Sequence, residues 1–194
     1  MFAMLASEAG AHSQREVFVP EFHPKPKSSQ PCTDGEPHSA EAWMDVYADG
    51  TPDITDVLGG VTVCHPAATR YVAGAAKTSA SAAERRAAEK MDHYVQTGGR
   101  QLTPLPCETW GRLGCHSEAV LAAWTAAANR RDWQHGRSPN QRAKRWRCML
   151  DACLQHSIAR MLHASRFGYA LRPCPRSPPP PDPSLTESLA PAGA

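Results

Sequence analysis

Four aspartates stand close together in "MDVYADGTPDITDVLGGVTVCHP", residues 44 to 66, at positions Asp45, Asp49, Asp53 and Asp56. Asp and Gly are common in turns, and solvated strands carry polar residues at alternate positions, so these residues suit a hairpin. Carboxylates from neighbouring strands can also bind one divalent cation, and two that converge here would form the centre of a nuclease site. The residues alone leave both interpretations open.

A lysine and a glutamate further along the chain could complete such a site. Lys90 lies three residues after Ala87 and next to Met91, at the edge of an apolar stripe, so it must reach solvent or meet a carboxylate. Glu108 follows the next extended segment. Mg²⁺ held by such carboxylates would offset the charge on a phosphate, while lysine stabilises that charge or orients water.

The elements that must position these residues can be predicted from hydrophobic periodicity. "WMDVY" and "PDITDV" form a predicted hairpin, and "GVTV" is a further strand or a continuation across a bulge at Gly59 and Gly60. A helix is predicted over residues 79–95 and should end at Gly98 and Gly99. "QLTPLPCETWGRLG" follows as an extended segment, and its two prolines predict an edge strand or a partly polyproline-like segment.

Two more helices complete the predicted order of strands, helix, strand, helix, helix. Ser117 should cap a helix that runs to about Arg130, and Pro139 should open a long helix with an apolar face that ends at Gly168. The predicted class is α/β, a small mixed β-sheet flanked by helices, with a C-terminal helical extension.

With 194 residues, 41% of them hydrophobic, the chain can bury one modest core. We expect residues 1–39 to be disordered, residues 40–115 to form the α/β core, residues 116–168 to form C-terminal helices with a basic linker, and residues 169–194 to be a disordered Pro-rich tail. Seven cysteines at irregular spacings and no signal peptide favour an intracellular setting. No apolar run is long enough to cross a membrane, so we expect no membrane partner.

Positive charge is concentrated in one stretch. Residues 130 to 147 include a single aspartate and seven basic residues. The basic residues are Arg130, Arg131, Arg137, Arg142, Lys144, Arg145 and Arg147. Trp133 and Trp146 lie among them, which is typical of a surface that binds a phosphate backbone with some stacking. The alternative is a loop with a solvated helix start, and Trp146 also fits the core face of the last helix.

The succession "MDVYADGTPDITDV…VTVCHP", "AERRAAEKMDHY", "LTPLPCETWGRLG" and "ARMLHASRFG" resembles the C-terminal region of non-LTR retrotransposon polyproteins. In that family a restriction-endonuclease-like domain of the PD-(D/E)XK type follows the reverse transcriptase. The resemblance covers roughly residues 40 to 168, and its most specific pieces are "VTVCHP" and "CETWGRLG".

The resemblance implies roles for individual residues. Asp45 matches the first metal-binding aspartate, Lys90 the lysine on the helix, and Glu108 the glutamate at the end of the strand. The second aspartate of the family directly precedes Val-Thr-Val, where this chain has Gly60. Either Asp56 keeps the role and "LGGV" is an insertion, or the site has lost a carboxylate and Asp53 is the nearest substitute.

The function implied by the resemblance is Mg²⁺- or Mn²⁺-dependent nicking of target DNA by an endonuclease-like domain of a retroelement. It also implies DNA as partner, with RNA or a separate reverse transcriptase as further partners, and a nuclear location. No reverse-transcriptase palm or zinc knuckle is present, so we expect a fragment or relic of a mobile element, or a captured piece of one. The alternative function is non-catalytic nucleic-acid binding by such a remnant.

Overall fold

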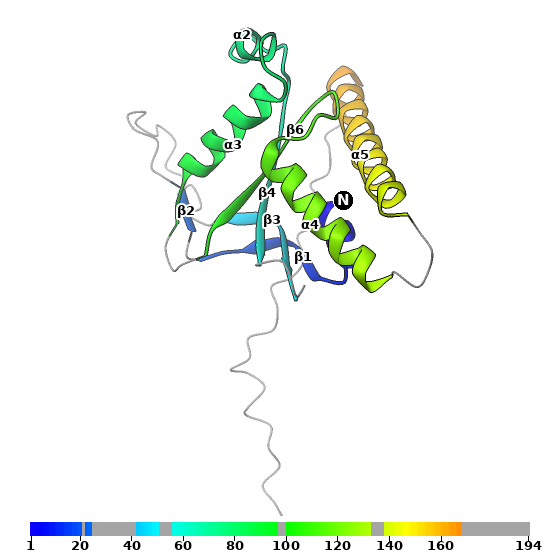
Figure 1. The fold of residues 1–194 in the computed structure, drawn as a ribbon. Helices are drawn as coiled ribbons and strands as arrows, with labels where there is room; N and C mark the ends of the chain where they lie inside the picture. Colours follow the sequence, from blue (N-terminus) through cyan, green and yellow to red (C-terminus); the bar gives the residue numbers. More distant parts are fainter. Residues whose placement is uncertain (21, 25–41, 51–55, 97–99, 133–137, 168–194) are drawn as a thin grey trace, which may run out of the picture.

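The computed structural model describes residues 1–20, 22–24, 42–50, 56–96, 100–132 and 138–167. Its centre is a four-stranded sheet in the order β1-β3-β4-β6. The strands are β1 (His12–Phe18), β3 (Trp43–Asp49), β4 (Val57–Cys64) and β6 (Leu102–Glu108). Neighbouring strands are antiparallel except for β4 and β6, which are parallel, and helices lie on both sides (Figure 1). The predicted class, a small mixed α/β sheet flanked by helices, is confirmed.

The aspartate-rich stretch forms the predicted hairpin, because β3 and β4 pair with Val46 opposite Gly59. β4 is one strand across Gly59 and Gly60, so of the two predicted alternatives for "GVTV" the continuation of the second strand is correct and the separate strand is not. Most of β4 is buried, since it has β3 on one side and β6 on the other with helices above and below. Residues 52–55, part of the second predicted strand, lie outside the described residues.

β6 is an edge strand, as its two prolines predicted. Parallel strands need a crossover connection, and the segment between β4 and β6 supplies it with helices α2 (Val72–Ala75) and α3 (Ser81–His93). Helix α3 ends before the predicted Gly98, because the chain becomes extended at Tyr94. There it forms β5 (Tyr94–Gln96), which pairs with β2 (Phe22–Pro24).

The expected disorder over residues 1–39 is wrong for its first part. The chain begins with helix α1 (Phe2–Glu8), in which Leu5 and Ala6 are fully buried, and continues into β1 and β2. The apolar run is too short to suggest a core by itself, and it is ordered by packing on β3 and on helix α4 (Cys115–Arg131). Residues 25–39 lie outside the described residues.

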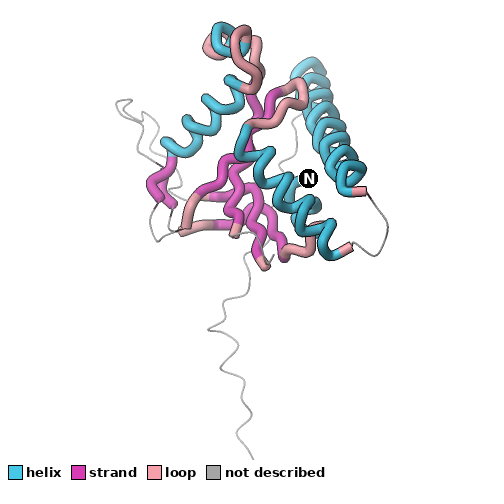
Figure 2. Tube along the Cα trace, in the orientation of Figure 1, coloured by secondary structure: helices cyan, strands magenta, loops and turns pink. Residues whose placement is uncertain are grey.

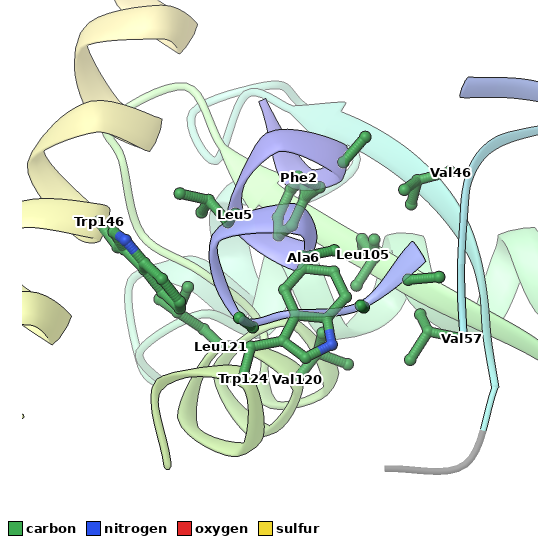
Figure 3. Packing of buried hydrophobic residues seen from close by; sticks show 14 of the residues in the cluster. Phe2, Leu5, Ala6, Val46, Val57, Leu105, Val120, Leu121, Trp124 and Trp146 are labelled. Carbon is green, nitrogen blue, oxygen red and sulfur yellow. The ribbon is translucent and has the colours of Figure 1, made fainter. Parts of the chain in front are cut away.

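One hydrophobic cluster joins this N-terminal helix to the rest of the molecule. Figure 3 shows Phe2 and Leu5 of α1 beside Leu105 of β6 and Trp124 of α4.

Ser117 does not cap α4 as predicted, because the helix begins at Cys115 and the Ser117 hydroxyl donates to the carbonyl of Pro106. The Glu84 carboxylate accepts a hydrogen bond from the Cys115 N–H at 2.5 Å instead.

The long last helix is confirmed as α5 (Pro139–Phe167), beside α4 in Figure 2. Trp146 is fully buried in its first half, as its place on the apolar face predicted. Met161 and Leu162 near its end are 52% and 64% exposed, so the predicted face is covered only in part. Within the described residues, no helix has both the length and the apolar character required to cross a membrane. The predicted tail, residues 169–194, lies outside them.

Candidate functional site

Asp45 stands where the ladder between β3 and β4 comes to an end. The last pair in that register is Val46 opposite Gly59. Beyond it, the Asp45 Oδ2 atom accepts a hydrogen bond from the Val61 N–H at 2.7 Å, so a side chain replaces the missing strand partner. The Asp45 side chain is 49% exposed, which leaves the carboxylate accessible from solvent.

Lys90 of α3 reaches the same point. Its Nζ atom lies 3.3 Å from Asp45 Oδ2 and donates to the Val61 carbonyl oxygen at 2.8 Å. The lysine side chain is 19% exposed, and the expectation that it must reach solvent or meet a carboxylate is confirmed by this ion pair. The ammonium therefore stands between two oxygen atoms, one charged and one neutral.

The absence of a side chain at Gly60 leaves the space that the end of the Lys90 side chain occupies. A Cβ atom at Gly60 would lie 2.5 Å from Lys90 Cε and 2.9 Å from Nζ, so the lysine occupies the space beside this position. The neighbouring Gly59 faces the opposite side of the sheet, where a Cβ would lie 2.4 Å from Val46 Cγ1 and 2.7 Å from Leu105 Cδ1. Gly60 thus belongs to the Asp45 and Lys90 cluster, and it supplies no carboxylate.

The structure does not bring Asp56 to Asp45. Asp56 directly precedes β4, and its Oδ2 atom accepts a hydrogen bond from the Tyr47 hydroxyl at 3.3 Å. It lies four residues before Gly60, which is roughly 13 Å along a strand. Burial, with smaller effects of Asp49 and Asp56, raises the pKa of Tyr47 to about 12. Asp53, the other candidate, lies outside the described residues.

Glu108 lies toward the other end of β4, in register with Cys64. It is 1% exposed, and Arg112 Nη1 is 4.0 Å from its Oε2 atom. Its Oε1 atom is buried with no hydrogen-bond partner among the described residues. Cys64 is four residues beyond Gly60, again roughly 13 Å along the strand, so this carboxylate is also remote from Asp45.

A network of polar contacts fixes α3 on β4 and thereby holds Lys90 in place. Arg86 donates to the Thr62 hydroxyl at 3.0 Å and to the Glu89 carboxylate at 3.0 Å, which also accepts from Tyr71 at 3.2 Å. Burial acts to raise the pKa of Glu89, but the hydrogen bonds from Arg86 and Tyr71 outweigh it and lower that pKa. The fold holds Glu89 in its charged form.

Most of the predicted nucleic-acid-binding residues form internal ion pairs. Arg142 is 6% exposed and binds Asp132 at 2.9 Å, which leaves its guanidinium almost no surface to offer to a ligand. The acidic partners of the block are Glu8, Asp132 and Glu118, and their contacts involve Arg131, Arg142, Arg145 and Arg147. Lys144 and Arg130 are exposed on the helices, and Arg137 lies outside the described residues.

The cluster therefore contains two of the four predicted catalytic residues, Asp45 and Lys90, together with the Val61 carbonyl. Sequence reasoning missed that carbonyl because a backbone atom leaves no mark on residue type. Across the described ranges, no three or more His, Cys, Asp or Glu side chains group closely enough to hold a metal ion. Comparisons with protein-family models, curated proteins and solved structures find no match to this chain.

Proposed function

We propose that this chain is an endonuclease-like domain that nicks DNA by metal-dependent phosphodiester hydrolysis, with Asp45 and Lys90 at its reaction centre. One observation carries the proposal. The Lys90 ammonium lies within contact of both the Asp45 carboxylate and the Val61 carbonyl, at an exposed break in the β3–β4 ladder. A carboxylate and an amine from distant parts of the chain meet there, and an amine can stabilise the charge that develops on a transferred phosphate.

The oxygen atoms in this cluster suit a hard divalent cation. Mg²⁺ keeps several waters and commonly takes only one or two carboxylates together with substrate phosphates, so Asp45 and the Val61 carbonyl would hold it alongside a DNA phosphate. Bound there, Mg²⁺ or Mn²⁺ would offset the charge on the phosphate and supply an activated water. Lys90 now shares these two oxygens, so it would turn toward the phosphate and stabilise the same charge.

Gly60 makes a direct test possible. Nicking of supercoiled plasmid should require Mg²⁺ or Mn²⁺ and should be lost in Asp45→Asn and in Lys90→Met, which keep the size of each side chain. Gly60→Asp should increase the rate, because it adds a carboxylate beside Lys90 where the flexible end of that side chain must move and the Leu102 methyl group must shift slightly. Asp56→Asn should leave the rate unchanged, since its carboxylate binds Tyr47 instead.

Two results would contradict this assignment. Nicking that persists in both Asp45→Asn and Lys90→Met would place the chemistry elsewhere, and loss of nicking in Asp56→Asn would return the second aspartate to the site. Thermal unfolding of each variant shows whether a lost activity reflects a lost fold.

A second candidate function is non-catalytic binding of nucleic acid. It is favoured by Gly60, which leaves the cluster one carboxylate short of the family pattern. Retention of plasmid at low salt by a wild-type protein that does not nick, with or without metal, would select this candidate. Under either function the resemblance implies a nuclear location, and RNA or a separate reverse transcriptase as further partners.

A further inference from the structure

Trp110 is the most exposed of the large apolar residues that the structure describes, with 67% of its surface accessible. It follows β6, in the loop that leads to α4, at the end of the molecule where the last turns of α5 lie (Figure 1). An indole of this size gains free energy when it is buried, so an exposed one on an ordered turn is a candidate contact for a ligand.

The backbone around Trp110 is held in place on both sides. The Thr109 N–H donates to the Cys64 carbonyl at 2.9 Å, and the Gly111 N–H donates to the Glu108 carbonyl at 2.9 Å. Gln155 of α5 donates to the Thr109 carbonyl at 2.8 Å, which ties the turn to the last helix. Binding of a ligand that stacks on this indole would therefore have a small entropy cost, because the loop is already ordered.

His65 fixes the direction of the ring. It lies at the end of β4, its Nδ1 atom is 2.7 Å from the Thr109 hydroxyl, and its ring meets Trp110 nearly at right angles with centroids 5.6 Å apart. The carboxyl ends of the parallel strands β4 and β6 bring these two residues together. The segments "VTVCHP" and "CETWGRLG" thus meet at the carboxyl ends of these two strands.

The contacts described around the indole are polar. Its ring meets His65, and Asp151 of α5 lies against the neighbouring Gly111, while the exposed Arg112 is paired with Glu108. A protein anchor pocket would surround a tryptophan with apolar residues, whereas an unpaired base needs only a flat, exposed ring on which to stack. A base therefore fits this site through stacking.

The position also suits a ligand that reaches the Asp45 and Lys90 cluster. His65 is five residues beyond Gly60, which is roughly 17 Å along a strand. At about 3.4 Å per nucleotide this corresponds to about five steps of a DNA strand. One DNA molecule could contact both places.

We propose that Trp110, braced by His65, is a stacking site for an unpaired base of DNA. The choice of DNA rests on the proposed function, but base stacking needs no cleavage. The site would give this domain a preference for DNA with a single-stranded stretch over fully paired duplex, because a base inside a duplex is already stacked on its neighbours.

Fluorescence anisotropy can test this with a labelled blunt duplex and the same duplex carrying a single-stranded extension. Wild type should bind the extended DNA more tightly. Trp110→Ala should weaken that binding by roughly tenfold to a hundredfold, and leave blunt-duplex binding within about twofold. Trp110→Phe should retain most of the preference, because a smaller aromatic ring still stacks.

Phe18→Ala is the matched control, since Phe18 is an exposed aromatic residue, 43% accessible, on β1 at the other edge of the sheet. It should bind both DNAs as wild type does. Equal binding by Trp110→Ala and wild type, equal losses on both DNAs, or no binding of extended DNA by wild type would each overturn the proposal. Asp45→Asn separates the two proposals, because it should lose nicking and keep the preference for extended DNA.

Discussion

Two regions of this chain carry chemistry-bearing side chains, and the fold treats them in opposite ways. The Asp45 and Lys90 cluster is scattered in the sequence, and the structure assembles it at an exposed break in a strand ladder. The basic segment from Arg130 to Arg147 is dense in the sequence, and the structure uses much of its charge in ion pairs. Density of charge along a chain is therefore a poor guide to charge at the surface.

One acidic partner of the basic segment comes from the N-terminal helix, far away in the sequence. Glu8 belongs to α1, yet its carboxylate accepts from Arg145 at 2.9 Å and from the Trp146 indole N–H at 2.8 Å. This contact spans almost the whole described chain and holds α5 against the N-terminal helix. The basic segment accordingly has a structural role, because it joins α5 to α1.

The largest effect should come from removing the buried centre of that joint. Trp146→Ala should lower the free energy of unfolding by roughly 3 to 5 kcal/mol, because it leaves a cavity and removes the hydrogen bond to Glu8. Urea denaturation followed by circular dichroism measures the loss. A change below about 1 kcal/mol would mean that α5 does not depend on this contact.

A second test separates structural from surface charge within the basic segment. Arg142→Ala should cost roughly 2 to 3 kcal/mol of unfolding free energy, because it removes the charged hydrogen bond to Asp132 and the packing of a side chain that is only 5% exposed. Lys144→Ala, on the exposed side of the same helix, should cost less than about 0.5 kcal/mol. Equal costs in thermal denaturation would refute the contrast.

The two adjacent glycines of β4, Gly59 and Gly60, test whether the Asp45 and Lys90 cluster is packed as tightly as the core on the other face of the sheet. Gly59→Ala should cost about 1 to 3 kcal/mol, since its methyl group would collide with Val46 and Leu105 in the core. Gly60→Ala should cost less than Gly59→Ala, about 1 kcal/mol, because the flexible end of the Lys90 side chain moves and the Leu102 methyl group 3.1 Å away has to shift only slightly. The same denaturation experiment compares them, and the reverse order would show that Gly60 faces packed core.

The smallest effect concerns the support of Lys90 and depends on pH. The lowered pKa of Glu89 means that its charge stabilises the fold above the ordinary pKa of a glutamate, and that this stabilisation is lost as the pH falls through the lower folded-state value. Glu89→Gln should therefore cost about 1 kcal/mol near neutral pH and progressively less in acid. A cost that is constant from neutral to acid pH would exclude the linkage.

Local pattern was enough for much of the fold. The alternation of "WMDVY" predicted β3, two prolines predicted that β6 is an edge strand, and an apolar stripe predicted α3 and the burial of Trp146. It failed at α1, whose short apolar run becomes ordered only against β3 and α4. It also misplaced the ends of α3 and the start of α4, where strand pairing and the Glu84 carboxylate decide the boundary.

The candidate site was predicted in part for a similar reason. The place of Lys90 beside a buried stripe required a carboxylate or solvent, and Asp45 proved to be that carboxylate. Asp56 and Glu108 suited the pattern equally well, but strand register places them about four residues away from Gly60 in opposite directions along β4. Residue type and spacing do not encode that register.

The sequence by itself determined the periodic elements, the α/β class and the presence of an amine that needed a partner, because these follow from contacts between residues near one another in the chain. Only the tertiary structure decided which carboxylate met that amine, that a backbone carbonyl joined them, and that the basic segment would pair with carboxylates that include Glu8 of the N-terminal helix. Those outcomes depend on strand register and on close packing between residues that are far apart in the sequence, and neither can be read from local residue patterns.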